Sequence, residues 1–199
     1  MRLEDSESYT ELKLEGGVLP GVRGASVSGG RLRGVSLAGQ VFRLLHLEKV
    51  RLEECDLSNC EWEMPSLEEV ELTGCRLTGF RIRGGRAVEL KLRECYGQYA
   101  QFDGVELKEA RFDGCQLGEA SFVRCALDRA VFADCDLRGT VMAGVRLNGA
   151  DLRDCRIDGI RAGLDDLAGA ILDPRQAAAI LFGHAAITVL EPGEDPPQR

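Results

Sequence analysis

The stretch FDGCQLGEASFVRCALDRAVFADCDL, residues 112–137, decides the fold, because its apolar residues and its cysteines recur at fixed intervals. Neither the helical period of 3.6 nor the strand period of 2 produces an interval of five or ten. Such an interval indicates a structural repeat. The large apolar residues stand five apart, at Phe112, Leu117, Phe122, Leu127, Phe132 and Leu137, and the cysteines stand ten apart, at Cys115, Cys125 and Cys135.

The same phase continues through most of the chain. From Val22 to Leu172, the positions whose numbers end in 2 or 7 define 31 consecutive pentapeptides without an insertion or deletion. Only Ala87, Gly97 and Ala162 lack a large apolar side chain there. Two positions earlier in each pentapeptide the residue is mostly small or apolar. Two inward positions in every five residues therefore predict that each pentapeptide forms one side of a coil.

The cysteines add a period of twenty. All eight occupy the smaller inward position, and six of them recur every twenty residues, at Cys55, Cys75, Cys95, Cys115, Cys135 and Cys155. Four pentapeptides then make one square coil, and nearly eight coils stacked about 4.8 Å apart give a rod about 37 Å long. Of 24 glycines, 14 have numbers ending in 4 or 9, the third position of a type II turn, which requires a positive φ. The sequence predicts an all-β solenoid.

The units GVSLAGQVF (34–42), EARFDGCQL (109–117) and GADLRDCRI (149–157) resemble the pentapeptide repeat family. The resemblance implies a right-handed quadrilateral β-helix of about eight coils with a short C-terminal capping and dimerisation helix. We expect an N-terminal segment or cap at 1–20, the β-helix at 21–172, a helix and strand for capping and dimerisation at 173–190, and a disordered tail at 191–199.

The cysteine column could serve core packing, metal binding or disulfide formation. Stacked thiols suit a soft metal ion, but zinc needs four converging ligands, and parallel side chains are poor partners for disulfides. Free cysteine also behaves as a small buried hydrophobe. We expect packing, with no metal and no cofactor. Stacked aromatic residues such as Phe102 and Phe122 are also expected in the core, and Tyr96 and Tyr99 are expected to cover the gap at Gly97.

Composition narrows the function classes. The net charge is −8 and the isoelectric point is near 4.9, which argues against direct binding to nucleic acid or to an anionic membrane. The N-terminus has no apolar signal segment, so we expect a cytoplasmic protein. No nucleophile elbow, phosphate loop or zinc spacing is present, and His46 and His184 are not expected to meet. The sequence predicts a protein that is not an enzyme.

Charge is distributed in bands. Residues 48–71 carry nine acidic side chains against two basic ones, and residues 76–93 carry six basic side chains against one acidic. B-DNA carries one charge per about 1.7 Å, or about 22 over 37 Å, so only the acidic band reaches that density. Alternatively, neighbouring coils neutralise each other through surface ion pairs. The acidic band is the predicted partner-binding surface, with Glu53, Asp56, Glu61, Glu63, Glu68, Glu69 and Glu71.

The repeats end at a helix signal. Asp173 is a good N-cap, Pro174 suits the first turn and Gln176 completes a capping box. Ala177, Ile180, Leu181 and His184 should share one helical face. Outward positions near this end are apolar, so the predicted dimerisation residues are Val123, Val141, Ala143, Ile180, Leu181 and Ile187.

An acidic pentapeptide rod that ends in a D-x-x-Q-A-x-A helix is similar to the topoisomerase-protecting group, which includes the MfpA and Qnr types. The resemblance implies a homodimer joined at its C-terminal ends that binds DNA gyrase or topoisomerase IV and protects it from quinolones or natural poisons as a partial DNA mimic. The absence of loop insertions and the basic band depart from the Qnr pattern. The alternative is a generic interaction scaffold with an unrelated protein partner.

Overall fold

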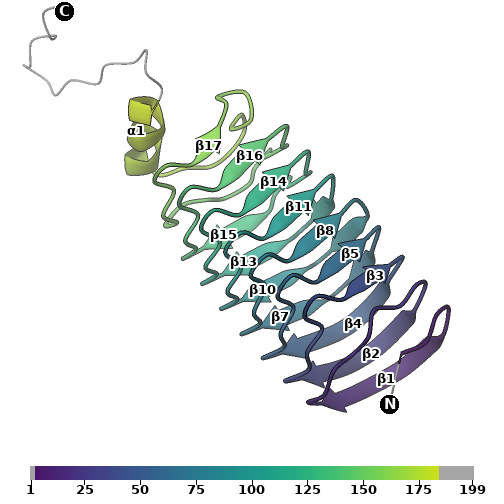
Figure 1. The fold of residues 1–199 in the computed structure, drawn as a ribbon. Coiled ribbons are helices and arrows are strands. Elements are labelled where there is room, and N and C mark those ends of the chain that lie inside the picture. The colour runs from purple at the N-terminus through teal and green to yellow at the C-terminus, as the bar shows by residue number, and fades with distance from the viewer. Residues whose placement is uncertain (1–2, 184–199) are drawn as a thin grey trace, which may run out of the picture.

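The computed structural model describes residues 3–183, which form a parallel β-solenoid of about eight coils with one short helix at the C-terminal end (Figure 1). From residue 21 onward, paired strands of successive coils lie in register at an offset of twenty residues, as in Leu72↔Leu92 and Phe102↔Phe122. The first coil is two residues shorter, because Ser8 pairs with Ser26 and Glu15 with Arg33. This confirms the predicted β-helix and its square coil of four pentapeptides.

The strands are short except near the N-terminus. Within residues 3–183, three strands contain eight residues, β1 (Ser8–Glu15), β2 (Ser26–Arg33) and β4 (His46–Glu53). The others are β3 (Val41–Arg43), β5 (Glu61–Glu63), β6 (Ser66–Glu68), β7 (Glu71–Thr73), β8 (Arg81–Arg83), β9 (Arg86–Val88), β10 (Lys91–Arg93), β11 (Gln101–Asp103), β12 (Glu106–Lys108), β13 (Arg111–Asp113), β14 (Ser121–Val123), β15 (Val131–Ala133), β16 (Val141–Ala143) and β17 (Arg161–Ala162).

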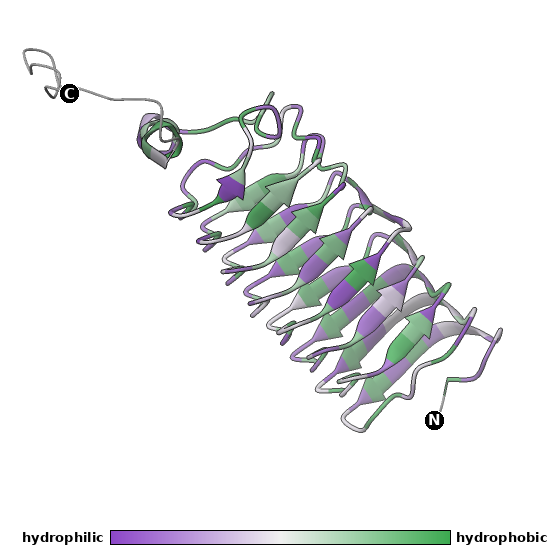
Figure 2. Ribbon diagram, turned by 45° about the horizontal axis from the view of Figure 1, so that its top comes forward, coloured by the Kyte–Doolittle hydropathy of each residue, from purple (hydrophilic) through white to green (hydrophobic). Residues whose placement is uncertain are grey.

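The coil has four sides. Side 1 is a sheet in the order β17-β16-β14-β11-β8-β5-β3. Side 2 follows β12-β9-β6-β4 and side 3 follows β4-β7-β10-β13-β15, and the two meet because the long strand β4 runs across the corner between them. Side 4 is held by single bridges, such as Ser36↔Asp56 and Asp56↔Arg76. In many of the short strands, such as β8, a buried hydrophobic residue lies between two outward hydrophilic ones (Figure 2), so these strands have an inward and an outward face. Strands β15 and β16 are hydrophobic throughout.

The corners adopt left-handed backbone conformation whether or not they carry glycine. Gly104 has a φ of 63° and Gly114 of 60°, as expected. Among residues 3–183, however, fifteen non-glycine residues with numbers ending in 4 or 9 have φ between 50° and 63°, including Glu54 and Glu94. Each such residue is disfavoured by about 1–2 kcal/mol relative to a right-handed one. Packing and the hydrogen bonds between coils therefore impose the corner geometry on side chains that do not prefer it.

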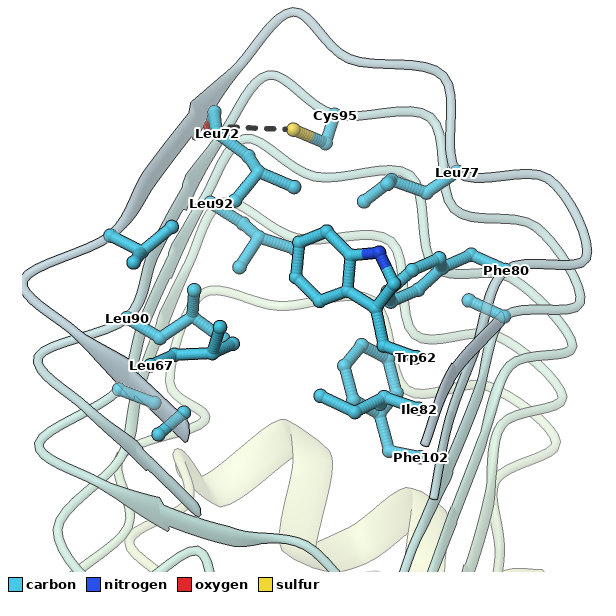
Figure 3. Close-up of a cluster of buried hydrophobic side chains, with 14 of the residues drawn as sticks. Trp62, Leu67, Leu72, Leu77, Phe80, Ile82, Leu90, Leu92, Cys95 and Phe102 are labelled. Carbon is cyan, nitrogen blue, oxygen red and sulfur yellow. Dashed lines mark hydrogen bonds between the residues drawn. The ribbon is translucent and has the colours of Figure 1, made fainter. Parts of the chain in front are cut away.

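Aromatic side chains stack inside the coil as the twenty-residue period predicts. The ring centroids of Phe102 and Phe122 lie 4.7 Å apart, with an angle of 7° between the ring planes. Those of Phe112 and Phe132 lie 4.5 Å apart, with an interplanar angle of 3°. Nearer the N-terminus, Trp62 contacts Phe80 edge to face at 5.2 Å among buried leucines (Figure 3). These rings are core residues with no exposed face for a ligand.

The column of six cysteines is packed in the core, and its thiols are also hydrogen-bond donors. Cys95 Sγ donates to the carbonyl of Leu72 at 3.5 Å (Figure 3), and Cys115 donates to that of Leu92 at 3.4 Å. Thr140 holds the same position of its pentapeptide on another side of the coil, and its hydroxyl donates to the carbonyl of Leu117 at 3.3 Å. Sulfur therefore fills the corner and satisfies a carbonyl, which alanine at this position cannot do.

The gap at Gly97 is filled differently from the prediction. Tyr96 and Tyr99 are 60% and 59% exposed, so they do not cover it. Leu117 of the next coil takes the space, because its Cδ2 atom lies 2.8 Å from the position that a Cβ at Gly97 would occupy. The tyrosines project outward because their positions in the pentapeptide are outward positions.

The C-terminal end is closed by α1 (Pro174–Gly183) and by one glutamine. Asp173 Oδ1 accepts hydrogen bonds from the N–H groups of Arg175 and Gln176, and Gln176 Oε1 accepts one from the N–H of Asp173. This is the predicted capping box. Gln176 is 5% exposed although it is polar, which indicates a second role for its side chain.

That second role is to replace the missing next coil. Gln176 Nε2 donates to the carbonyls of Leu152 at 2.7 Å and Cys155 at 2.9 Å. In an earlier coil, the equivalent carbonyl of Cys135 accepts the N–H of Arg156, twenty-one residues later. One carboxamide thus supplies donors to two carbonyls of the last coil, whose edge would otherwise be open.

Candidate functional site

The seven predicted acidic residues lie on all four sides of the rod. Glu61 and Glu63 are on side 1, Glu68 is on side 2, and Asp56 is on side 4. Side 3 carries the rest of the outward acids, with Glu69 at its corner, Glu71 on β7 and Glu53 at the end of β4. A band that is continuous in sequence therefore becomes a ring around the rod, because each coil turns through four directions in twenty residues.

Most of this ring is ion-paired with the coils on either side. Of the seven acids, six form an ion pair with a basic residue within the described chain, and Glu68 forms none. Glu61 pairs with Arg83 at 2.9 Å, for example. The other pairs are Glu53–Arg31, Asp56–Arg76, Glu61–Arg81, Glu63–Arg43, Glu69–Lys49, Glu71–Arg51 and Glu71–Arg93.

Asp56 illustrates how such a carboxylate is held in its charged form. Partial burial opposes ionisation, but the N–H of Ser58, 2.9 Å from Oδ1, and the charge of Arg76 outweigh it and lower the pKa of Asp56. The surface pair itself contributes little to stability, because both partners are solvated. It does, however, remove Asp56 from any free anionic surface.

The rod body is close to neutral. Residues 21–172 carry 21 lysines and arginines against 24 aspartates and glutamates, a net charge of −3. Five of the eight net negative charges therefore belong to the flanking segments. The rod sides do not present the continuous negative charge of a DNA backbone.

The C-terminal end exposes large apolar side chains. Phe182 is 61% exposed, Leu164 50%, Ile171 42% and Leu181 36%. A cleft of about 650 Å³ runs along the corner of sides 2 and 3 and is lined mainly by charged residues. At the C-terminal end, a second cleft of about 270 Å³ lies between α1 and the last coil. Its lining residues are Ile157, Gly159, Ile160, Arg161, Ala162, Leu167, Ala179, Ile180 and Gly183.

The structure brings part of the predicted dimerisation set together. Val123 pairs with Ala143 across β14 and β16, and Val141 lies on the same side 1, all half-buried. Ile180 packs against the core and Leu181 is exposed on α1. Ile187, like His184, lies outside the described residues. Sequence reasoning missed Phe182 and Leu164, although an aromatic residue at the end of a short capping helix was a usable signal.

The helical face was only partly predicted. Ala177 and Leu181 are exposed, whereas Gln176 and Ile180 face the last coil. Gln176 takes the inward position because its side chain donates hydrogen bonds to two carbonyls of the last coil. The hydrophobic periodicity of the helix contains no information about these carbonyls. Leu181 is therefore left facing solvent.

Side 4 carries a patch formed by the two exposed tyrosines, Tyr96 and Tyr99. Its neighbours on side 4 include Arg76, which bridges to Tyr96, and Glu119 of the next coil, together with the uncharged Thr78, Gly79, Gln98, Gln116 and Gly118. Exposed tyrosine on a rigid surface is typical of protein-contact surfaces. Sequence reasoning missed this patch because it expected Tyr96 and Tyr99 to cover the gap at Gly97.

All eight cysteines are free and buried within residues 3–183. No group of three or more histidine, cysteine or carboxylate side chains there is arranged to hold a metal ion. Burial raises the pKa of Cys60 to about 12, and hydrogen bonding to Cys55 together with burial does the same for Cys75. Cys55, at the start of the column, has its pKa lowered to about 7 by the hydrogen bond with Cys75, but only 1% of its surface is exposed.

No helix in the described part of the chain is long and apolar enough to cross a membrane. No curated protein matches this sequence. Among solved structures, QnrB1, a plasmid-mediated fluoroquinolone resistance protein, aligns with 92% of this chain and all of its own, at 19% identity and a TM-score of 0.41. HetL, a pentapeptide repeat protein involved in heterocyst differentiation regulation in the cyanobacterium Nostoc, aligns with 78% of this chain and 89% of its own, at 19% identity and a TM-score of 0.45.

Family models match the chain in two adjoining segments. A pentapeptide repeat region matches residues 45–122, and a model of eight pentapeptide repeats matches residues 120–159. The two matches lie within the solenoid. Together they extend over more than half of the 199 residues, and the chain belongs to the pentapeptide repeat family.

Proposed function

We propose that this chain is a non-enzymatic binding protein that acts as a dimeric rod, and that its partner is DNA gyrase or topoisomerase IV, which it protects from quinolones or natural poisons. The observation that carries the proposal is the contrast between the two kinds of surface. The sides of the rod are ion-paired and charged, whereas the C-terminal end exposes Phe182, Leu181, Leu164 and Ile171. Two rods joined at that end would extend about 74 Å, at about 37 Å each.

The contact with the topoisomerase is assigned to the acidic ring, with Glu68 as its most direct probe. Glu68 is exposed and forms no ion pair within the described chain, although Lys49 interacts with it electrostatically. Glu61 is a poor probe, since reversing its charge would also leave Arg81 and Arg83 facing a third positive charge. Glu109 is a matched control, because it is equally exposed and lies two coils beyond Glu69 at the same corner.

The test is a gyrase supercoiling assay with a fluoroquinolone, titrated with wild-type protein, Glu68→Lys and Glu109→Lys. We expect the wild type and Glu109→Lys to restore supercoiling and Glu68→Lys to lose the effect. Protection by all three would contradict the assignment to the acidic ring. No protection by the wild type, with either gyrase or topoisomerase IV, would contradict the topoisomerase proposal.

A second candidate function is an interaction scaffold, and the patch formed by Tyr96 and Tyr99 on side 4 favours it. Two tyrosines that are each about three-fifths exposed would supply large contact area with little loss of side-chain freedom. The pair Tyr96→Ser and Tyr99→Ser separates the candidates. If topoisomerase protection survives both substitutions, the patch serves a different partner. If protection is lost, the patch belongs to the topoisomerase contact.

A further inference from the structure

The two ends of the rod are finished differently. The C-terminal coil is closed by Gln176 and α1, but the N-terminal coil ends in the eight-residue strand β1, which pairs with β2 and, within residues 3–183, with no other strand. Soluble proteins rarely leave a long sheet edge open without charged residues or a covering element. Here the edge carries charges, and their arrangement specifies a partner.

The half of β1 on side 3 directs two residues outward. In later coils, the residue equivalent to Lys13 donates its N–H to the preceding coil, as Lys91 does to Val70 at 2.9 Å. The residue equivalent to Glu15 presents its carbonyl to the preceding coil, as Glu53 does to Gly34 at 2.9 Å. Because alternate residues of a strand direct both backbone groups the same way, Lys13 and Glu15 offer theirs at the open edge.

Their side chains are also available. Lys13 and Glu15 are exposed, and neither makes an ion pair in the part of the chain that the structure describes. Leu14 between them is half-buried against the core, with its backbone groups directed toward Leu32 of β2. Lys-Leu-Glu thus forms a short edge with an inward apolar residue at its centre and opposite charges on either side.

We propose that two copies of this chain associate through β1, antiparallel about a two-fold axis at Leu14. In this register Lys13 of one copy lies opposite Glu15 of the other, twice. Both are hydrogen-bonded pairs, in which the facing residues exchange two N–H···O bonds and their Cα atoms lie about 5.5 Å apart. The two leucines form the non-hydrogen-bonded pair between them, with Cα atoms about 4.5 Å apart. The arrangement makes four backbone hydrogen bonds and two opposite-charge cross-strand pairs.

Charge complementarity selects a second copy as the occupant of this edge. An antiparallel strand that fits must carry an acid opposite Lys13 and a base opposite Glu15, with an apolar residue between them. The same segment in a second copy, read in reverse, supplies all three in the required order. The contact lies at the opposite end of the rod from α1, so it is separate from the dimer contact proposed above.

The test is sedimentation equilibrium of the full chain with charge-reversed variants. Lys13→Glu or Glu15→Lys alone places like charges opposite each other twice, and we expect each to weaken self-association by at least about tenfold. An equal mixture of the two variants restores opposite charges at both pairs, so association should return between unlike copies. Failure of the mixture to associate, or no change in either single variant, would overturn the proposal.

Two further measurements keep this contact distinct from the C-terminal one. Lys13→Pro removes an edge N–H that has no acceptor in the described chain, and proline is tolerated at sheet edges, so association should fall while the unfolding midpoint stays the same. Leu181→Glu changes only the other end. If Leu181→Glu alone abolishes all association, or the wild type stays monomeric at every concentration, pairing through β1 is refuted.

Discussion

Gln176→Leu is expected to destabilise the C-terminal coil, because it removes the carboxamide without greatly changing side-chain volume. The substitution removes the hydrogen bonds from Gln176 to the carbonyls of Leu152 and Cys155 and from the Asp173 N–H to Gln176. Leu152 keeps a weaker contact from the Cys155 N–H at 3.3 Å, whereas no other bond to the Cys155 carbonyl is present in the described chain. One buried unpaired carbonyl and two further lost bonds together correspond to about 2–6 kcal/mol.

The assay has a global and a local readout. Urea unfolding should shift to a lower midpoint, and hydrogen exchange should quicken at the N–H groups of Arg156 and Ile171, which bond across the last coils. Terminal coils of a solenoid contribute through their neighbours, so local exchange is the more sensitive measurement. Unchanged exchange at both amides in Gln176→Leu would refute the capping role.

Gln176→Glu separates the two roles of the side chain. The introduced carboxylate can still accept the Asp173 N–H, but it cannot donate to the two carbonyls and it places a charge beside them. Burial near carbonyl oxygens should raise the pKa of this carboxyl in the folded state. Stability should therefore be greatest at low pH, where the protonated group can donate one bond, and should fall as the pH rises through the raised pKa. Equal stability of the variant and the wild type at neutral pH would contradict this account.

Three other predictions concern the corners, the surface and the core. Gly104→Ala should lower the free energy of unfolding by about 1 kcal/mol through its positive φ alone. Gly85→Ala should lower it clearly more, because its Cβ would lie 2.3 Å from the carbonyl oxygen of Pro65. Urea unfolding of the two variants measures the difference. Arg138, 2.5 Å from Asp136, lowers the pKa of that carboxyl, so its contribution to stability is present above the unfolded pKa and is lost as the pH falls; Asp136→Asn should reduce the acid sensitivity of the unfolding midpoint. Thiol reagents should label none of the eight buried cysteines in native protein and all eight in urea, with labelling of the native state contradicting their burial.

The repeat phase was sufficient to predict the solenoid, because the same two positions of each pentapeptide face inward in successive coils. Phe112 over Phe132 and Cys95 over Cys115 follow from counting by twenty, since no insertion interrupts the register. The capping box at Asp173 and Gln176 was also predictable from local sequence. Each of these features depends on neighbours at a fixed offset in the chain.

The surface was predicted less well, because a contiguous sequence segment is not a contiguous surface on this fold. Glu61 and Glu71 are ten residues apart yet belong to opposite sides, and each is paired with basic residues of adjacent coils. Counting charge along the chain therefore overstated the anionic surface. The second role of Gln176 was not predictable either, since it depends on which carbonyls the last coil leaves open.

The twenty-residue coil also determines how this protein can change in length. One inserted residue would exchange inward and outward positions in everything that follows, whereas twenty would add a complete coil and preserve every pairing. Each added coil would move the Gln176 closure away from β1 by about 4.8 Å without altering either end. Duplication or deletion of whole coils would therefore change the distance between the two ends of the rod in uniform steps, without changing the residues that form either end.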